Sequence, residues 1–416
     1  MANATGLAVG DEGIDALDPR RCEQLVGHIG AEQALYDAYA SGRFHHGWLI
    51  TGVEGIGKAS LAWRITRFLQ VQAYDAVHGA SNLFGRAQPQ DSASLFGDDL
   101  ALDPAGDTSP AAQPTSLISP LYTEASHPVV RRILSGAHDG VRYLSAQADP
   151  KTGKMRKEIT VAQVRELLGF FTRTGERDSW RIAIVDSVDH MNRSAANALL
   201  KILEEPPEKA AIFLVSHAPG RLLPTIRSRC RTLALSPLSE NDMAAFIKNA
   251  VPEVGGDDVA TLLALCDGAP GRALYFHESG AVGLLTEVMA SMSAAARQNL
   301  DGAHVFAASL SSVKNEARYK LVVQIIQWCF ARVVRARALL DTVGVAASPA
   351  SLGLPAGADA AASAINDMAR LIALEAWLEM WDKTRERFIQ LDALNMDEQT
   401  VLVSFFNDLA AFARTA

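Results

Sequence analysis

The sequence lacks the features that usually attach a chain to a membrane or stabilise it with disulfides. Its 416 residues contain no apolar run of the roughly 18 residues that a membrane-spanning helix needs. Residues 1–6 have neither the basic start nor the apolar stretch of a secretory signal. The four cysteines are scattered without a Cys-x-x-Cys pair, so neither a disulfide framework nor a zinc site is expected: Cys22, Cys230, Cys266 and Cys329. We therefore expect a cytoplasmic protein.

Positive charge is also in short supply. Lys and Arg number 39 against 47 Asp and Glu, which gives a formal net charge of −8. Because DNA-backbone binding depends on Lys and Arg that neutralise phosphates, this balance is evidence against a dedicated DNA-binding surface. Apolar residues make up 49% of the chain, and a chain of this length usually forms more than one core. We expect two or three domains.

The most informative segment, residues 180–231, begins with an apolar strand that ends in a carboxylate. Residues 181–185 are apolar and β-branched, as is typical of a buried parallel strand, and Asp186 follows where it can reach the Mg²⁺ of a bound nucleotide. Ser187 comes next. ATPases with such a strand usually have an acid there to polarise the attacking water, whereas a serine hydroxyl is a poor general base. The strand is predicted to hold a metal without supporting hydrolysis.

A phosphate-binding loop is predicted after the apolar residues 48–50. In the pattern G-x-x-x-x-G-K-[ST], glycines let backbone N–H groups surround phosphates, and the lysine reaches the outer phosphates. The residues that fit these roles are Gly52, Gly55, Gly57 and Lys58. We expect ATP or ADP to bind there. The alternative is a glycine-rich turn that only packs a strand against a helix.

The hydroxyl that would ligate Mg²⁺ in this pattern is missing, because Ala59 occupies its position. Ser60 is the next residue, but one step along a helix turns a side chain by roughly 100° away from the phosphates. With Ser187 as well, two positions of the metal chemistry are lost while the scaffold remains. The combination predicts a pseudo-enzyme whose nucleotide is structural, with weak or absent Mg²⁺. An active ATPase that uses Ser60 and Asp189 is the alternative.

At this point the chain resembles the clamp-loader branch of the AAA+ proteins. The resemblance covers about the first 275 residues, and the segments that carry it are residues 42–59, residues 197–207 and Ser228-Arg229-Cys230. Motor subunits of that branch have Asp-Glu-x-His after the strand, whereas this chain reads Asp-Ser-Val-Asp from Asp186 onward. In this respect the chain is similar to the non-hydrolysing partner of the motor subunits.

The resemblance implies three domains: an α/β AAA+ P-loop domain with a parallel sheet (1–235), a small helical lid (236–295), and an all-α oligomerisation domain, or collar (296–416). It implies a hetero-pentameric ring with gamma/tau and delta subunits, which meets the sliding clamp and primed DNA as a complex. Relatives often carry a zinc module after the P-loop helix. Here residues 82–128 instead form a Pro- and Asp-rich insertion, predicted to be a flexible acidic loop.

The resemblance also implies roles for three further residues. Arg229 would complete the active site of a neighbouring subunit in trans, a contribution on the order of 10³–10⁵ in rate; without the resemblance it reads as an ordinary salt-bridged surface residue. Ser216, at a strand end, would sense the terminal phosphate or be a simple strand-end hydroxyl. Arg272 would reach from the lid to the nucleotide.

In a second alternative reading of the whole chain, the ATP site is vestigial and only the C-terminal helices contribute, as a scaffold for assembly.

The remaining pattern is helical. Apolar residues at helical spacing predict helices at 159–168 and, after Asn192, at 193–205. Beyond residue 235, helices are predicted at 239–251, 257–266, 319–340, 365–394 and from 397, with an Ala/Gly/Pro-rich linker at 343–362.

Overall fold

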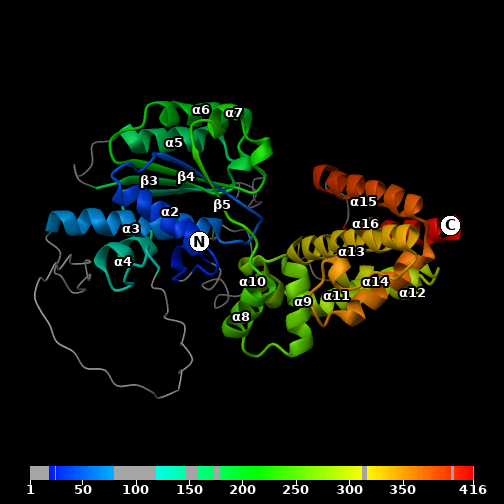
Figure 1. Cartoon of the computed structure of the whole chain (residues 1–416). Coiled ribbons are helices and arrows are strands. Elements are labelled where there is room, and N and C mark those ends of the chain that lie inside the picture. The colour runs from blue at the N-terminus through cyan, green and yellow to red at the C-terminus, as the bar shows by residue number, and fades with distance from the viewer. Residues whose placement is uncertain are drawn as a thin grey trace, which may run out of the picture.

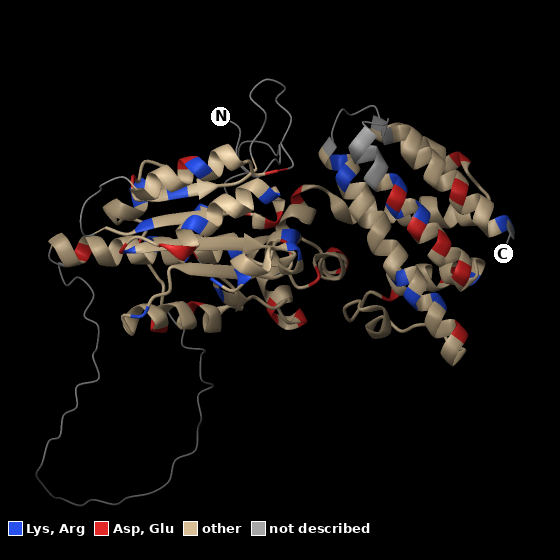
Figure 2. Ribbon diagram, turned by 90° about the horizontal axis from the view of Figure 1, so that it is seen from above, with Lys and Arg blue, Asp and Glu red and all other residues tan. Residues whose placement is uncertain are grey.

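The computed structural model describes residues 18–23, 25–78, 119–146, 158–172, 179–311, 316–394 and 398–415. An α/β part contains the sheet, a helical part ends at the C-terminus, and helices α8–α10 lie between them (Figure 1). Basic and acidic residues are interspersed over both parts in the view of Figure 2.

A five-stranded parallel sheet is the centre of the α/β part (Figure 1). Its order is β2-β3-β4-β1-β5, and all neighbouring strands pair in parallel. The strands are Gly47–Thr51 (β1), Val141–Leu144 (β2), Arg181–Val185 (β3), Ala210–Ser216 (β4) and Arg231–Ala234 (β5). Strands β1 and β4 are buried along their whole length because helices cover both faces. The predicted α/β class with a parallel sheet is confirmed.

Successive strand residues point to opposite faces and build two separate cores. Trp48 and Ile50 of β1 pack with one set of buried residues, while Leu49 between them packs with the other. One face is covered by α2 (Ile29–Ala40), α3 (Lys58–His78) and α4 (Pro128–Leu134), the other by α5 (Val161–Thr172), α6 (Arg193–Glu204) and α7 (Pro224–Arg227) (Figure 1).

Helix α6 follows its sequence pattern closely. The Asn192 side chain accepts a hydrogen bond from Ala195 N at 2.9 Å and so caps the helix. The predicted apolar stripe is buried: Ala195, Leu199, Ile202 and Leu203. The helix ends at Glu204, shortly before two prolines. The prediction for this segment is confirmed.

The rest of the chain is helical: α8 (Glu240–Ala250), α9 (Gly256–Cys266), α10 (Pro270–Glu278), α11 (Ala281–Ala296), α12 (Asp301–Ser311), α13 (Glu316–Val343), α14 (Asp359–Leu371), α15 (Leu374–Leu394) and α16 (Glu398–Thr415). Short 3-10 turns are Pro19–Arg21, Val188–His190, Pro219–Arg221 and Ala350–Leu352. None of the helices within these described ranges is both long and apolar enough to cross a membrane.

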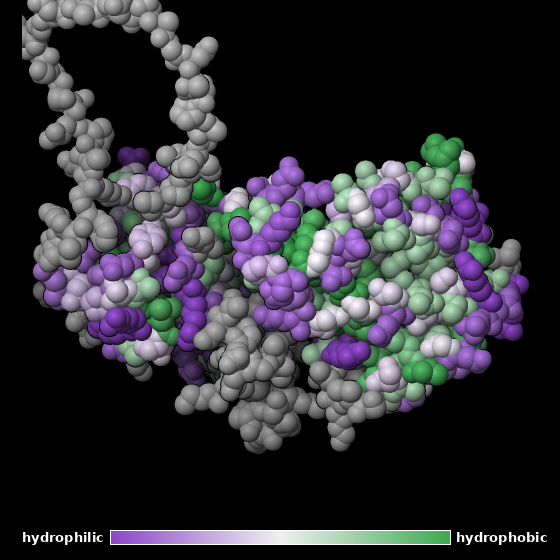
Figure 3. Space-filling view, turned by 90° about the horizontal axis from the view of Figure 1, so that it is seen from below, coloured by the Kyte–Doolittle hydropathy of each residue, from purple (hydrophilic) through white to green (hydrophobic). Residues whose placement is uncertain are grey.

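The helical part differs from its sequence prediction in three ways. Helices α11 and α12 were not predicted. The single helix expected over 365–394 is wrong, because the chain is extended at Ile372 (φ −134°, ψ 143°) and separates α14 from α15. The linker expected at 343–362 includes the start of α14. On the face seen in Figure 3, hydrophobic residues lie among hydrophilic ones over this part.

The predicted acidic insertion, 82–128, falls mostly on residues 82–118, outside the described residues. Its last ten residues are described, and an exposed loop is wrong for part of them. Leu121 is buried against α3 and its neighbours. The Ser119 hydroxyl donates to Glu32 at 2.6 Å and accepts from Arg64 at 2.8 Å. These contacts join the returning chain to a buried Arg64–Glu32 ion pair. Residues 150–157, which include four Lys and Arg in the sequence, also lie outside the described residues.

Candidate functional site

The predicted phosphate-binding loop connects β1 to α3. Its glycines have positive φ angles: Gly52 (147°), Gly55 (76°) and Gly57 (104°). Residues other than glycine rarely adopt such φ angles. Because parallel strands end at the same edge of a sheet, the ends of β1, β3 and β4 meet here, where ligands of open α/β sheets bind.

Three neighbouring segments lie so close to these glycines that a larger residue would not fit. A Cβ atom on Gly52 would lie 2.6 Å from the Leu235 carbonyl oxygen, and one on Gly57 would lie 2.6 Å from Leu25 Cδ1. A Cβ on Gly55 would lie 2.7 Å from the backbone nitrogen of Arg272. The loop is therefore held by the exit of β5, the N-terminal segment and helix α10. This packing gives the glycines a structural reason in addition to phosphate binding.

Lys58 lies at the centre of the loop and is 3% exposed. Its Nζ donates to the carbonyl oxygens of Gly52 (2.8 Å) and Val53 (2.6 Å). Burial lowers the Lys58 pKa to about 8, and the carboxylates of Asp186, Glu54 and Asp189 oppose that shift. An ammonium group has three N–H donors, so one remains for a ligand. The charge and position fit a phosphate.

Asp186 follows β3, as predicted, and is held by Tyr143. The Tyr143 hydroxyl donates to Asp186 Oδ2 at 2.6 Å, and burial and the nearby carboxylate raise the Tyr143 pKa. Ser187 has the left-handed φ of 59°. Its Oγ lies 3.5 Å from Asp186 Oδ1 and 3.1 Å from His217 Nε2. Asp186 can still offer Oδ1 to a cation, but Ser187 adds no negative charge beside it.

Asp189 is engaged by the end of β4. Its Oδ1 accepts from the Ser216 hydroxyl at 2.7 Å. Its Oδ2 accepts from the backbone N–H groups of His217 at 2.6 Å and Ala218 at 3.3 Å. A serine hydroxyl has one proton to donate, so Ser216 would have to leave Asp189 before it could donate to a phosphate. Asp189 was noted in the sequence only as an alternative base, and this structural role was missed.

Arg272 and Ser60 lie near the loop, and the Arg272 guanidinium is engaged outside it. Arg272 follows the start of α10, and its Nη1 lies 2.9 Å from Asp267 Oδ2. Its guanidinium also lies over the ring of Phe276, 5.2 Å from the centroid. Ser60 is the third residue of α3 and is half-buried. Across the described part of the chain, this site included, no three His, Cys, Asp or Glu side chains are grouped as metal ligands.

Arg229 lies apart from this group, just beyond α7. Its Nη2 is 2.9 Å from Glu204 Oε1, and its Nη1 donates to the Thr225 carbonyl at 3.0 Å. The side chains of Arg229 and Glu204 are 36% and 48% exposed. Glu204 ends α6, so two of the segments that carry the family resemblance meet in this surface ion pair.

A groove beside the loop was not predicted from the sequence. It has a volume of about 290 Å³ and is lined by residues 27–31 and 234–242. The buried His28 lies at its edge, with Nε2 3.1 Å from the Ile56 carbonyl oxygen of the loop. Burial lowers the His28 pKa, so the ring is neutral near pH 7, while Asp242 adds a carboxylate to the lining of the groove. No local sequence pattern marks this groove, because its two walls are about 200 residues apart.

Comparison with known proteins points to DNA polymerase III. The family described as "DNA polymerase III, delta subunit" matches residues 122–239. The delta-prime subunit of Pseudomonas aeruginosa is 39% identical over 124 residues, which cover 30% of this chain and 38% of the relative. The delta-prime subunit of Escherichia coli is 28% identical over 248 residues, covering 59% and 58%. The gamma subunit of Buchnera aphidicola (subsp. Schizaphis graminum) is 24% identical over 254 residues, covering 61% and 55%. The chain therefore spans 38% to 58% of the length of these relatives.

Solved structures align more loosely. A gamma subunit-related protein of Thermotoga maritima is 18% identical with a TM-score of 0.30 and covers 66% of this chain and 84% of that one. The RuvB Holliday junction branch migration motor of the same organism is 14% identical with a TM-score of 0.35, covering 82% and 88%. At such scores the fold rests on the sheet and loop described above. By sequence, this chain is similar to the delta-prime and gamma subunits of DNA polymerase III, which agrees with the clamp-loader resemblance of its motifs.

Proposed function

We propose that this chain is a non-hydrolysing subunit of delta-prime type in the bacterial clamp loader of DNA polymerase III, working in the cytoplasm. In this role it presents Arg229 to the ATP of a neighbouring motor subunit while the sliding clamp is loaded on primed DNA. One observation carries the proposal. The acids after β3 are engaged by Tyr143 and by the end of β4, while Arg229 lies outside that site in an exposed ion pair.

The surroundings of Arg229 suit a residue that changes partners. A guanidinium is charged at every physiological pH and binds phosphate oxygens through a planar fork of donors. An ion pair as exposed as Arg229–Glu204 contributes about 1 kcal/mol or less to stability. A triphosphate carries several negative charges, so it can compete with Glu204 for Arg229 at little cost to the fold.

The chain's own pocket can hold a nucleotide as a structural ligand. The N–H groups of the loop and the Lys58 ammonium would bind the phosphates, and Asp186 would face any cation beside them. The groove at 27–31 and 234–242 lies beside the loop, and its volume of about 290 Å³ is close to that of the smallest ligand sites, so the base would be placed there. With Ala59 and Ser187 in place of a hydroxyl and an acid, bound ATP would persist.

The C-terminal helices are the expected site of assembly with gamma/tau and delta subunits in a hetero-pentameric ring. Large exposed apolar side chains in this part support the proposal: Val305, Val343, Val345 and Leu378. Apolar residues on a surface favour contact with another protein when they form a patch. Removal of residues after 295 is expected to abolish assembly.

Substitution of Arg229 tests the proposal in a reconstituted loader. Arg229→Ala should lower ATP turnover at the neighbouring site by a factor on the order of 10³ while the ring stays intact by size-exclusion chromatography. Arg227→Ala is the matched control, since Arg227 is an exposed arginine of α7 two residues away. Equal turnover in both variants and the unmodified loader would reject the trans role and favour a purely structural subunit.

The likeness to gamma subunits makes an active motor the second candidate. That candidate needs Asp189 as the base, yet both Asp189 oxygens accept hydrogen bonds from β4 and its exit. An active motor would hydrolyse ATP as a purified chain and lose the activity in Lys58→Ala.

A further inference from the structure

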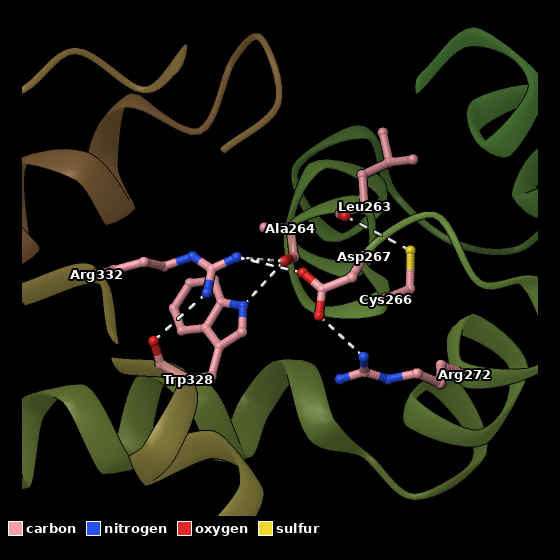
Figure 4. A network of polar contacts seen from close by, with 7 residues as sticks. All are labelled: Leu263, Ala264, Cys266, Asp267, Arg272, Trp328 and Arg332. Carbon is pink, nitrogen blue, oxygen red and sulfur yellow. Dashed lines mark hydrogen bonds and ion pairs between the residues drawn. The ribbon is translucent and has the colours of Figure 1, made fainter. Parts of the chain in front are cut away.

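Asp267 receives two guanidinium groups from different parts of the chain (Figure 4). It follows α9 with a left-handed φ of 49°. Its Oδ2 lies 2.9 Å from Arg272 Nη1, and its Oδ1 lies 3.5 Å from Arg332 Nη2. Arg272 belongs to α10 and Arg332 to α13, so one carboxylate joins the lid to the first long helix of the C-terminal part.

The Arg272 end of this network touches the phosphate-binding loop. Gly271 N donates to the Gly55 carbonyl oxygen at 2.8 Å. A Cβ on Gly271 would lie 2.9 Å from that same oxygen, so the backbones of the lid and the loop are in direct contact. A shift of the loop on phosphate binding must therefore move the start of α10, where Arg272 is located.

The Arg332 end is attached to α9 by a tryptophan. Trp328 Nε1 donates to the Ala264 carbonyl oxygen at 2.9 Å, and Arg332 Nη2 donates to the same oxygen at 3.3 Å. The Arg332 guanidinium lies 3.9 Å from the centroid of the Trp328 ring. Burial lowers the Arg332 pKa and Asp267 opposes the shift. Across the described residues, Arg332 Nε has no acceptor.

The two contacts on Asp267 are unequal and compete for one charge. Arg272 is at ordinary ion-pair distance and is the more exposed of the two arginines, at 27% against 12%. Arg332 is more buried but only reaches 3.5 Å. If Arg272 left for a phosphate, Arg332 alone would neutralise the Asp267 carboxylate, and the attraction between these opposite charges would draw the two side chains closer. That movement would change the environment of the Trp328 indole, which lies against the Arg332 guanidinium.

We propose that Asp267 is a positioning residue that holds Arg272 away from the phosphate-binding loop until a nucleoside triphosphate binds. Arg272 then exchanges Asp267 for the phosphate, and Arg332 closes on Asp267. Nucleotide occupancy is thereby transmitted to α13 and the C-terminal helices. The inference deepens the proposed function and rests on nucleotide binding at the chain's own loop.

The signal of Trp328 tests this coupling in the full chain. The protein would be labelled with 5-fluorotryptophan, and Trp328→Phe would identify the ¹⁹F resonance of Trp328. Saturation with a non-hydrolysable ATP analogue and Mg²⁺ should shift that resonance in the unmodified chain. Asp267→Asn keeps the size and tolerates the left-handed backbone. This variant should bind the analogue as well or up to about fivefold more tightly, because Arg272 is released, yet lose more than half of the shift.

A second pair of variants separates the proposed relay from a general effect of mutation. Arg332→Gln should bind the analogue normally and also lose the shift, while Asp258→Asn, an exposed acid of the same helix α9, should behave like the unmodified chain. A full shift in Asp267→Asn, or a Trp328 resonance that ignores bound analogue in the unmodified chain, would overturn the coupling and leave the nucleotide site standing. Absence of binding in the unmodified chain would overturn both, and the binding isotherm separates that case.

Discussion

The two sides of the candidate nucleotide site differ in how their polar groups are engaged. On the P-loop side, three glycines have positive φ angles and the buried Lys58 ammonium donates to two backbone carbonyl oxygens, an arrangement that fits phosphate binding. On the opposite side, at the ends of β3 and β4, Asp186 and Asp189 are hydrogen-bonded to the protein itself. Binding a triphosphate and hydrolysing it depend on different groups, and here the acids that hydrolysis would use are hydrogen-bonded to Tyr143 and to the end of β4.

Removal of Asp189 is expected to have the largest effect on this comparison. Asp189→Ala leaves the Ser216 hydroxyl and two backbone N–H groups without their charged acceptor, so the free energy of unfolding should fall by about 2–4 kcal/mol. Denaturant unfolding measures the change. Asp139→Ala, which removes an exposed acid before β2, should change stability by less than about 0.5 kcal/mol. If Asp189→Ala left the free energy of unfolding unchanged, Asp189 would not be needed to stabilise the sheet edge and would be free to act as a base.

The second prediction concerns Lys58 and pH. Phosphate binding needs the protonated ammonium, so ATP affinity should fall by up to about tenfold per pH unit above its pKa of about 8, and Lys58→Met should remove this dependence. Stability should move the other way. The unfolded lysine titrates at 10.5, so between pH 8 and 10.5 the unfolded state binds more protons, and the free energy of unfolding rises with pH. Isothermal titration and denaturant unfolding across this window check both signs.

The smallest effect is expected at Tyr143, whose hydroxyl holds Asp186. Tyr143→Phe removes one hydrogen bond to a carboxylate that keeps partial access to solvent, so the free energy of unfolding should fall by about 1 kcal/mol. Tyr122→Phe is a control with an exposed ring. Equal stability in the two variants would show that Asp186 is not held from this side.

The parts of this site that the sequence predicted are those set by neighbouring residues. The strand at 181–185, the loop at 52–58 and the capped helix after Asn192 each follow from local apolar pattern, glycine spacing or a capping side chain. The contacts of Asp189 with the exit of β4 and of Gly55 with Gly271 depend on how distant elements pack. No local signal could reveal them.

Two further misses have physical reasons of their own. The break between α14 and α15 occurs at Ile372, without glycine or proline. The apolar side chain of Ile372 fits the pattern of a continuous helix, and it is buried. Residues 119–128 are rich enough in polar and proline residues to suggest a loop, but Leu121 and Ser119 attach them to the buried Arg64–Glu32 pair. In both cases burial by distant residues decided the conformation.

The proposed function requires that this chain binds ATP and leaves it intact. The most direct measurement mixes the purified chain with a limiting amount of γ-labelled ATP and Mg²⁺, isolates the complex, and follows the label over several hours. We expect the unmodified chain to keep its label, with nearly all of the bound nucleotide recovered as ATP. The Lys58→Ala variant should retain no label. Release of labelled phosphate from the unmodified chain, abolished by Lys58→Ala, would contradict it.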